Sequence, residues 1–363
     1  GDMDAPMAGP RCYAALSFAG DAAAAAPFAP ATAFLPRWQV TASDGAYTAV
    51  ANACIEPGTD IDALARRMLA AHGKFEQFDY DHAAAPAQNA IKSLREAVGG
   101  SAAFENNVTE ALGRIADGHY EKIVLARAVD LELQRPIAPL EWLNRLRERF
   151  PGCYSLCFNA GGPDSFIAAT PERLLKVADG HLWTEAVAGS APRGINARED
   201  AVRAAELLAS EKNLREHRAV IASIRTRMGT LGATFDEPPP PRLLKLSNVQ
   251  HLRTVLDIPW PPGRHILDAA AVLHPTPAVG GKPREAALRD IPALEGFPRG
   301  LFAGALGWID PQGCGELVVG IRCGQVNGTR ARLFAGAGIV EGSQPADELA
   351  ETDLKLQALR STL

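Results

Sequence analysis

Segments with the composition of β-strands follow one another in this chain of 363 residues without a regular alternation of strand and helix. Residues 122–133 (KIVLARAVDLEL) predict one long strand, because Ile, Val and Leu dominate the segment. Several strands are expected within 153–177, and three short ones around 301–309, 316–323 and 331–335. Such runs of strands predict an α+β fold with large, mostly antiparallel sheets.

Helices are expected between these runs, where apolar residues recur every three or four positions. Ser101 can cap one of the helices and Gly118 can end it. Acidic residues open the segment 197–228, which predicts one long helix that closes near Gly229. The expected helices cover 61–72, 101–118, 139–150, 197–228 and 346–363.

The formal net charge of −5 at pH 7 argues against nucleic acid or an anionic membrane surface as a partner. No run of about 18 or more apolar residues is present, so a membrane-spanning helix is not expected. The opening GDMDAPMAGP lacks the basic and apolar segments of a secretory signal. We therefore expect a cytoplasmic protein, in which an anionic ligand would need a local cationic pocket.

The cysteines are scattered, and the close pair Cys153 and Cys157 has no second pair at matching spacing. This spacing does not predict a zinc site. In a domain of this size we expect reduced, mostly buried thiols. The six cysteines are Cys12, Cys54, Cys153, Cys157, Cys314 and Cys323.

The last expected helix carries two stripes of side chains. Glu348, Glu351 and Lys355 step by three and four residues, so two carboxylates and an ammonium share one face. Spacing alone favours an ordinary Glu351–Lys355 pair on a solvated surface. The neighbouring stripe is mostly apolar and expected to be buried; it comprises Leu349, Thr352, Leu356, Leu359 and Leu363.

The loop before this helix, 334–343 (FAGAGIVEGS), contains glycines that allow the backbone to approach a ligand closely. A helix that begins beside such a loop can present backbone amides to a carboxylate. The long middle helix adds Glu211, Glu216 and His217, which alone describe an ordinary charged helix. Carboxylates on two helices would suit Mg²⁺, because that ion takes a few carboxylates and keeps water for substrate oxygens.

Eight motifs occur in a fixed order from Gly113 to Leu363. They are EKIVLAR, ATPERLLKV, AVAGSAPRG, LLASEKNLREH, LHPTPAVGGKPREAAL, LFAGALGWID, VVGIRCG and LFAGAGIVEGSQPADELAETDLKL. This ordered series resembles the chorismate-utilising enzymes, which include isochorismate, salicylate, anthranilate and aminodeoxychorismate synthases. The resemblance implies two stacked, mostly antiparallel sheets with helices on the outside and the active site between the sheets. It also implies one catalytic domain over 1–363, with a weakly patterned part (1–100) and a motif-bearing part (101–363).

The resemblance implies chorismate as the substrate and Mg²⁺ as the cofactor. It assigns the metal mainly to Glu216 and Glu351, with Glu348 helping directly or through water. Chorismate carries two carboxylates; a guanidinium can bind one bidentately, and an ammonium or Mg²⁺ can neutralise the other. For His274 the alternative is a structural histidine that is hydrogen-bonded under the pocket. The implied substrate-binding residues are Gly189, Ser190, His274, Arg322, Gly336 and Lys355.

The branch of the family is indicated by two positions. Lys122 stands where the ammonia-using synthases typically carry Gln, which implies addition of water and no glutaminase subunit. Ala188 stands where aminodeoxychorismate synthases carry a nucleophilic Lys, so a covalent mechanism through that position is excluded. Members of the water-using branch are often monomeric, which implies a monomer here.

Lys122 is the implied general base for the attacking water, and Glu172 the implied acid for the departing hydroxyl on the opposite face of the ring. These roles require a lowered pKa for the lysine and a raised pKa for the glutamate. The alternatives are an exposed lysine at a sheet edge and a glutamate in a surface turn.

The implied activity is that of an isochorismate synthase, an isomerase. Salicylate synthase is the alternative, because it forms isochorismate first and then expels pyruvate. The passage LHPTPAVGG and Phe302 resemble isochorismate synthases, since salicylate synthases often have Tyr at the position of Phe302. A catalytically silent chorismate-binding subunit is a third possibility, which intact Lys122 and Glu172 argue against. Whether isochorismate feeds a siderophore, salicylate or menaquinone stays open.

Overall fold

The computed structural model of the protein describes residues 7–20, 27–43, 46–75, 91–96, 100–245 and 249–363. The strands are β1 (Cys12–Leu16), β2 (Ala31–Phe34), β3 (Trp38–Ser43), β4 (Ala46–Ala51), β5 (Ile91–Glu96), β6 (Lys122–Leu133), β7 (Tyr154–Asn159), β8 (Ser165–Thr170), β9 (Arg173–Ala178), β10 (His181–Pro192), β11 (Arg242–Lys245), β12 (Val249–Pro259), β13 (Gly281–Lys282), β14 (Ala305–Ile309), β15 (Gly315–Val319), β16 (Cys323–Asn327) and β17 (Arg330–Val340). The helices are α1 (Ile61–Phe75), α2 (Gly100–Ala116), α3 (Pro139–Arg149), α4 (Ala197–Ala209), α5 (Glu211–Gly229), α6 (Ile266–Leu273), α7 (Arg284–Glu295) and α8 (Pro345–Arg360).

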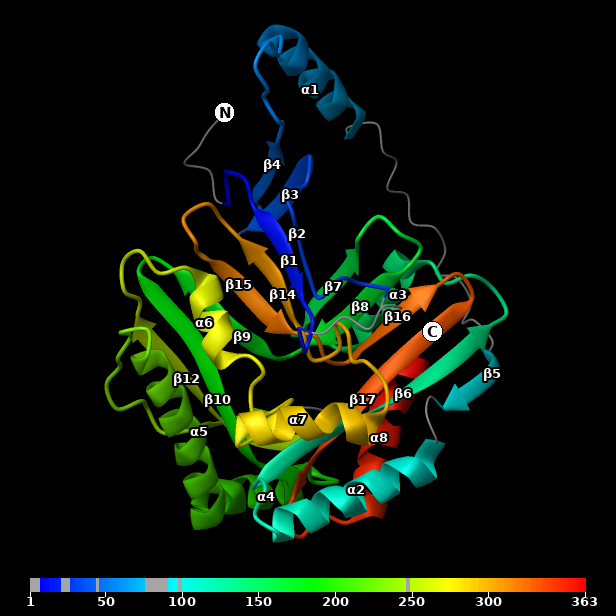
Figure 1. Cartoon of the computed structure of the whole chain (residues 1–363), viewed down its shortest axis with the longest axis vertical. Coiled ribbons are helices and arrows are strands. Elements are labelled where there is room, and N and C mark those ends of the chain that lie inside the picture. Colours follow the sequence, from blue (N-terminus) through cyan, green and yellow to red (C-terminus); the bar gives the residue numbers. More distant parts are fainter. Residues whose placement is uncertain (1–6, 21–26, 44–45, 76–90, 97–99, 246–248) are drawn as a thin grey trace.

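Two large sheets form the body of the protein (Figure 1). The larger has 8 strands in the order β11-β12-β10-β9-β15-β14-β1-β2. The smaller has 7 strands, in the order β13-β6-β17-β16-β8-β7 with β5 paired to β6. Every strand pairing among the described residues is antiparallel.

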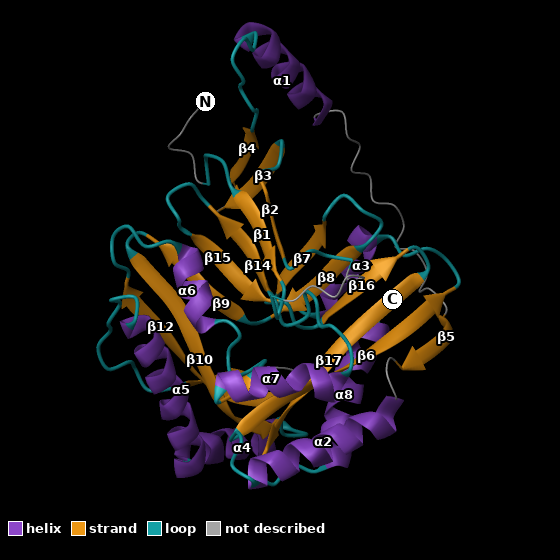
Figure 2. Ribbon diagram, in the orientation of Figure 1, coloured by secondary structure: helices purple, strands orange, loops and turns teal. Residues whose placement is uncertain are grey.

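Apart from α1, which projects from the body, the helices lie against these sheets (Figure 2). Helices α5 and α6 pack on β10 and β9 of the larger sheet, and α3 and α8 pack on β8 and β17 of the smaller. Alternate residues of β10, such as Leu182 and Ala186, join Ile221 and Ile266 of these helices in the main core. The arrangement confirms the predicted α+β fold with two mostly antiparallel sheets and helices on the outside.

The chain crosses from one sheet to the other at two adjacent places. Residues 171–172 connect β8 of the smaller sheet to β9 of the larger, and residues 320–322 connect β15 back to β16. The crossings are bonded to each other, because Val319 N donates to Glu172 O at 3.0 Å and Ala169 N donates to Arg322 O at 3.1 Å. Glu172 and Arg322 therefore lie where the two sheets meet.

The prediction of one long helix over 197–228 is wrong. The chain forms α4 and α5, which are separated by Ser210 in an extended conformation at φ −71° and ψ 106°. The Ser210 hydroxyl accepts from Asn213 N at 3.3 Å and so caps the start of α5. A serine can replace a helical backbone bond in this way, which ends one helix and begins another without disturbing the apolar periodicity.

The three short strands expected near the carboxyl end are also incorrect in detail. The segment 316–323 is not one strand: it ends β15 in one sheet and, after the crossing, begins β16 in the other. Residues 301–304 precede β14 as a turn, in which Ala303 N donates to Gly320 O at 2.7 Å. The segment 331–335 is part of the longer β17. An apolar run does not reveal that its two halves belong to different sheets.

The amino-terminal part contributes β1 and β2 to the larger sheet, while β3, β4 and α1 project from the body (Figure 1). Phe18 and Phe28, which come before and after residues 21–26 in the sequence, lie in the main core. In the part of the chain that the structure describes, no helix combines the length and apolar character needed to cross a membrane.

Candidate active site

Lys122 begins β6 and is not an edge residue. Its backbone faces Lys282 of β13 on one side and Val340 of β17 on the other. Its side chain passes over Gly338 of β17, where an added Cβ would lie 3.1 Å from Lys122 Cε and 3.5 Å from Nζ. The glycine thus leaves the space through which the amine reaches the site, and the alternative of an exposed edge lysine is wrong.

Burial is the main cause that lowers the pKa of Lys122 below its usual value. The charges of Glu216, Glu172 and Glu351 oppose this shift, so all three carboxylates lie within electrostatic reach of the amine. The residue nevertheless keeps some accessible surface. A group that is desolvated and still partly accessible is a candidate for a base that acts on a bound substrate.

Glu172 lies at the first crossing between the sheets. Burial raises the pKa of this carboxyl to about 7, against the opposing charge of Lys122. Thr276 Oγ1 donates to Glu172 Oε1 at a long 3.5 Å. The glutamate is only partly accessible, so the alternative of a plain surface turn is wrong.

Helix α8 brings its charged stripe to the glycines of β17. Lys355 Nζ donates to Glu351 Oε1 at 2.6 Å and to the backbone oxygen of Gly336 at 2.7 Å. The expected intrahelical pair of Glu351 and Lys355 therefore exists, and the same ammonium also binds the backbone of β17 at Gly336. Burial raises the pKa of Glu348, and the charge of Glu351 adds to the rise.

Glu216 lies exposed on α5, directly before the buried His217. His217 Nε2 is 2.8 Å from Thr254 Oγ1 of β12, and its Nδ1 is 3.3 Å from the backbone oxygen of Ala188 in β10. These contacts fasten the helix to the larger sheet. His217 thereby has a structural role, and it sets the direction in which Glu216 leaves the helix.

Arg322 lies at the second crossing, with a left-handed φ of 49°. Its guanidinium stands over the ring of Phe150 at 5.4 Å, and Nη1 is 3.6 Å from Cys153 Sγ. Among the described residues it forms no ion pair with a carboxylate. Such a guanidinium can accept an anionic ligand.

Gly189 and Ser190 lie at an irregularity in β10, where the pairing with β12 shifts between Val187 and Ser190. Gly189 adopts φ +80°, a conformation that glycine takes without strain. Ser190 Oγ is 2.7 Å from His251 Nδ1. Burial lowers the pKa of His251 to about 4, and the charge of Lys355 adds to the shift.

His251 and Thr276 are candidate site residues that sequence reasoning missed. The charges of Lys355, Glu351, Lys122 and Arg322 all act on His251, which places the imidazole among the predicted groups. The alternation of β12 could have indicated its side, since Gln250, Leu252 and Thr254 are buried and His251 points the other way. Alternation alone cannot tell which residues of other strands it meets.

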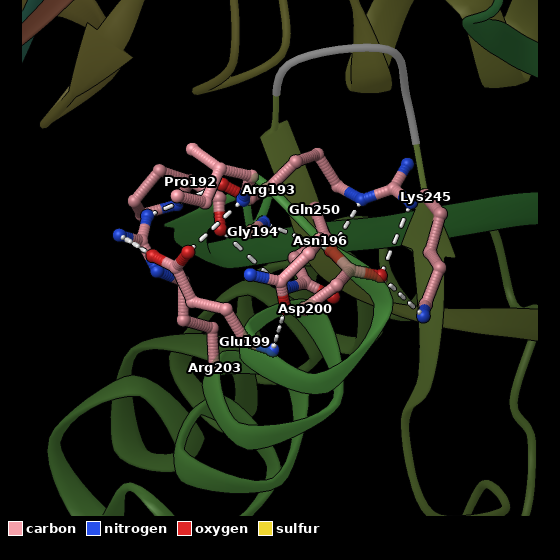
Figure 3. Close-up of polar contacts among 10 residues, drawn as sticks. Pro192, Arg193, Gly194, Asn196, Glu199, Asp200, Arg203, Lys245 and Gln250 are labelled. Carbon is pink, nitrogen blue, oxygen red and sulfur yellow. Dashed lines mark hydrogen bonds and ion pairs between the residues drawn. The ribbon is translucent and has the colours of Figure 1, made fainter.

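A polar network holds the end of β10 beyond Ser190 (Figure 3). Asp200 at the start of α4 accepts from Arg193 Nε at 2.6 Å and from Lys245 Nζ of β11 at 3.0 Å. These two bonds, that of Arg193 first, hold the pKa of Asp200 well below its usual value. Gln250 Nε2 donates to Pro192 O at 3.5 Å beside the pair of Ser190 and His251. The network ties β10, β11 and α4 together next to the site.

His274 ends α6, and burial lowers its pKa to about 4. Its ring lies edge-on to Phe18 at 6.4 Å. Neither ring nitrogen has a hydrogen-bond partner among the described residues. The alternative of a hydrogen-bonded structural histidine is therefore not what the structure shows.

A buried ion pair supports the strand that carries Lys122. Arg299 Nη2 donates to Val124 O of β6 at 2.8 Å, and Nη1 donates to Val279 O at 2.7 Å. Glu295 Oε1 accepts from Ala126 N of β6 at 2.7 Å and binds Arg299. On this side of β6, β13 pairs only with the start of the strand and β5 only with its end. Between them, these side chains supply the hydrogen-bond partners that a neighbouring strand would otherwise give to the backbone of β6.

The predicted metal ligands do not form a compact cluster. Among the residues that the structure describes, no group of three or more His, Cys, Asp or Glu side chains lies close enough to hold a metal ion. Glu216 and Glu351 come from α5 and α8, and both act electrostatically on Lys122. Mg²⁺ commonly uses one or two carboxylates and keeps its other positions for water and substrate, so this donor set fits that ion.

Comparisons with known proteins agree with this geometry. The family described as chorismate binding enzymes matches residues 1–363. The isochorismate synthase DhbC of Bacillus subtilis (strain 168) is 37% identical over 263 residues, 70% of this chain and 66% of that protein. MenF, an isochorismate synthase of the same organism, is 39% identical over 256 residues, 70% of this chain and 54% of that protein. The matched regions thus span about one half to two thirds of these relatives.

The solved structures add the fold. That of MenF, the menaquinone-specific isochorismate synthase of Escherichia coli, aligns with a TM-score of 0.83 at 27% identity. It covers 97% of this chain and 78% of the other. A structure of anthranilate synthase component I from Streptococcus pneumoniae aligns with a TM-score of 0.82 at 22% identity, which shows a common fold.

Proposed function

The chain belongs to the chorismate-binding enzyme family, and from this premise we propose that it is an isochorismate synthase. The observation that carries the proposal is the pair of Lys122 and Glu172, which are both partly accessible and lie within electrostatic reach of each other. Burial lowers the pKa of the lysine and raises that of the glutamate to about 7. Near neutral pH these shifts favour a deprotonated base beside a protonated acid, which is what addition of water with loss of hydroxide requires.

These two groups account for both proton transfers of the proposed reaction. Lys122 takes a proton from a water molecule as the water oxygen bonds to C2 of chorismate. The ring double bonds shift, and the C4 hydroxyl leaves with the proton of Glu172 as water. The product is isochorismate, and exchange with solvent restores both groups. Lys122 in place of Gln favours water over ammonia, so we propose that no glutaminase subunit takes part.

We propose that the cationic groups of the site bind the two carboxylates of the substrate. Arg322 offers a guanidinium that forms no ion pair among the residues the structure describes, and Lys355 lies beside the backbone of Gly336. Glu216 and Glu351, helped by Glu348, would hold Mg²⁺, which neutralises a carboxylate of the substrate when bound. Ser190 and His251 offer a hydroxyl and a neutral imidazole to the ring substituents.

Purified protein incubated with chorismate and Mg²⁺ tests the proposal. We expect reversible formation of isochorismate, measured by chromatography, without ammonia or a second subunit. EDTA should abolish turnover, and added Mg²⁺ should restore it. Anthranilate formed with ammonium salts, or salicylate as the main early product at neutral pH, would contradict the assignment. Absence of any turnover would favour a silent chorismate-binding subunit.

A further inference from the structure

A connected series of polar side chains crosses the larger sheet beside Glu172. Arg253 of β12 donates to Glu185 of β10 through Nε at 2.6 Å and Nη2 at 2.5 Å. Glu185 also accepts from Arg173 Nη2 of β9 at 3.1 Å, and Arg173 Nη1 is 3.7 Å from Glu316 Oε1 of β15. Tyr154 of β7, in the other sheet, donates its hydroxyl to Glu316 at 2.7 Å. This series of side chains therefore spans four neighbouring strands and bridges the two sheets.

Glu185 is the most buried residue of this series. Its side chain is 9% exposed, against 20% for Arg173 and 36% for Arg253. Two parallel bonds from Arg253 and one from Arg173 fix its carboxylate, a stronger arrangement than a single surface ion pair. Arg173 directly follows Glu172 and begins β9. Whatever holds Arg173 consequently also restricts the backbone that carries the acid.

We propose that Glu185 is a positioning residue for Glu172, on which it acts through Arg173 and through its own negative charge. This inference rests on the proposed function, because it treats Glu172 as the acid of the reaction. No motif singled out in the sequence contains Glu185, which directly precedes Ala186 of AVAGSAPRG. Its importance depends on contacts with the neighbouring strands β9 and β12.

The groups that face Glu172 come from several elements. Burial raises the pKa of Glu172 most, the charge of Lys122 from β6 lowers it, and the charge of Glu185 from β10 raises it. The hydrogen bond from Thr276, after α6, lowers it slightly. A fixed negative charge disfavours loss of a proton from a neighbouring carboxyl. Glu185 thus offsets Lys122 and helps Glu172 to keep its proton.

The charge of Glu185 is not among the main influences on the pKa of the base. The pKa of Lys122 responds, after burial, to Glu216, Glu172, Glu351 and Lys355. Removing the charge of Glu185 should therefore move one limb of the pH–rate profile and leave the other in place. A purely structural role would not produce such a selective shift.

The test is Glu185→Gln, which keeps the side-chain shape and removes the charge. We expect the limb that reports Glu172 to move to lower pH by about half a unit or more, which is about a threefold loss of kcat above that limb. The limb that reports Lys122 should stay, and Glu185→Asp should return the moved limb toward its original position. An unchanged profile in folded Glu185→Gln protein overturns the inference.

A direct titration separates this inference from the proposed function. The carboxyl of Glu172 can be followed by ¹³C NMR in protein labelled at glutamate and assigned with Glu172→Gln. Its pKa should fall in Glu185→Gln whether or not chorismate is turned over. Wild-type protein that does not convert chorismate would refute the proposed function, while the NMR titration still decides the role of Glu185.

Two further variants complete the experiment. Arg253→Gln removes two hydrogen bonds but leaves the charge of Glu185, so kcat should fall without a shift of the Glu172 limb to lower pH. Asp130→Asn disrupts a comparable bidentate pair, with Arg332 at 2.6 and 2.8 Å across β6 and β17, and should leave the profile unchanged. If all three variants moved the limb alike, the effect would be general loosening of the sheets and the inference would be wrong.

Discussion

At the scale of single residues, the proposed chemistry depends on two side chains whose pKa values burial shifts in opposite directions. Lys122→Ala and Glu172→Gln should each lower kcat by about 10² or more, because each removes a positioned proton-transfer group. Chorismate binding should change far less. Steady-state kinetics with separate kcat and KM values, on variants whose circular dichroism matches wild type, measures this. Near-normal turnover in Lys122→Ala would contradict the mechanism even within the same family.

The pH dependence of the same reaction follows from the signs of the two shifts. Activity should fall on the acid side as Lys122 gains a proton, and on the alkaline side as Glu172, with a pKa of about 7, loses one. Because the two groups act on each other, the limbs report the pair as well as its members. A profile of kcat/KM with a single limb would show that only one of the groups transfers a proton.

The proposed metal site belongs to the residue scale as well. Glu216→Gln replaces an exposed carboxylate with a neutral amide that cannot balance the charge of Mg²⁺. Activity should be lost mainly at limiting Mg²⁺ and partly recovered at high Mg²⁺, as measured by a metal titration of the rate. Glu211→Gln, on the same helix, is the matched control and should titrate like wild type. Equal Mg²⁺ dependence in both variants would remove Glu216 from the metal site.

At the scale of elements, β17 has to leave room for a side chain of β6. Gly338→Ala places a methyl group 3.1 Å from Lys122 Cε, so the lysine must move by a few tenths of an ångström. Since catalysis is sensitive to such displacement, kcat should fall by about tenfold with little change in the melting temperature. Gly113→Ala, on α2, meets no atom within 4 Å and should leave kcat unchanged. A Gly338→Ala enzyme with wild-type kcat would mean that the lysine adjusts without cost.

At the scale of the whole molecule, a buried ion pair joins β6 to the segment that follows α6. Arg299 and Glu295 have side chains that are 3% and 1% exposed. Arg299→Leu leaves the carboxylate of Glu295 buried without its cation, so the free energy of unfolding should drop by about 3–5 kcal/mol. Adding Glu295→Leu should restore part of this loss. Urea unfolding of the single and double variants measures the coupling, and strictly additive losses would show that the two residues act separately.

An exposed pair provides the comparison for that experiment. Arg332 and Asp130 have side chains that are 37% and 39% exposed. Breaking this pair should cost about 1 kcal/mol or less, because water already solvates both charges. The difference between the two losses of unfolding free energy measures how much burial increases the cost of breaking an ion pair.

The sequence by itself determined those features that depend on residues close together in the chain. The bounds of β6 match the predicted strand, because a long run of branched apolar residues has few alternatives. The stripe of Glu348, Glu351 and Lys355 follows from helical spacing, and its neighbouring stripe is buried at Thr352, Leu356 and Leu359 as expected. The ordered motifs likewise indicated the family and the α+β fold before any contact was known.

Only the tertiary structure decided which distant residues meet. The crossings at 171–172 and 320–322 bring Glu172 and Arg322 to the junction of the sheets. The sequence indicated only a turn at Glu172 and a single strand over 316–323. The pairing of β10 with β12 places His251 beside Ser190, and the order of the strands joins Glu185 to Arg173 and Arg253. Periodicity records which face of an element is apolar. Sheet order, crossings and burial set the partners and the pKa values, because these depend on atoms that are far apart in the chain.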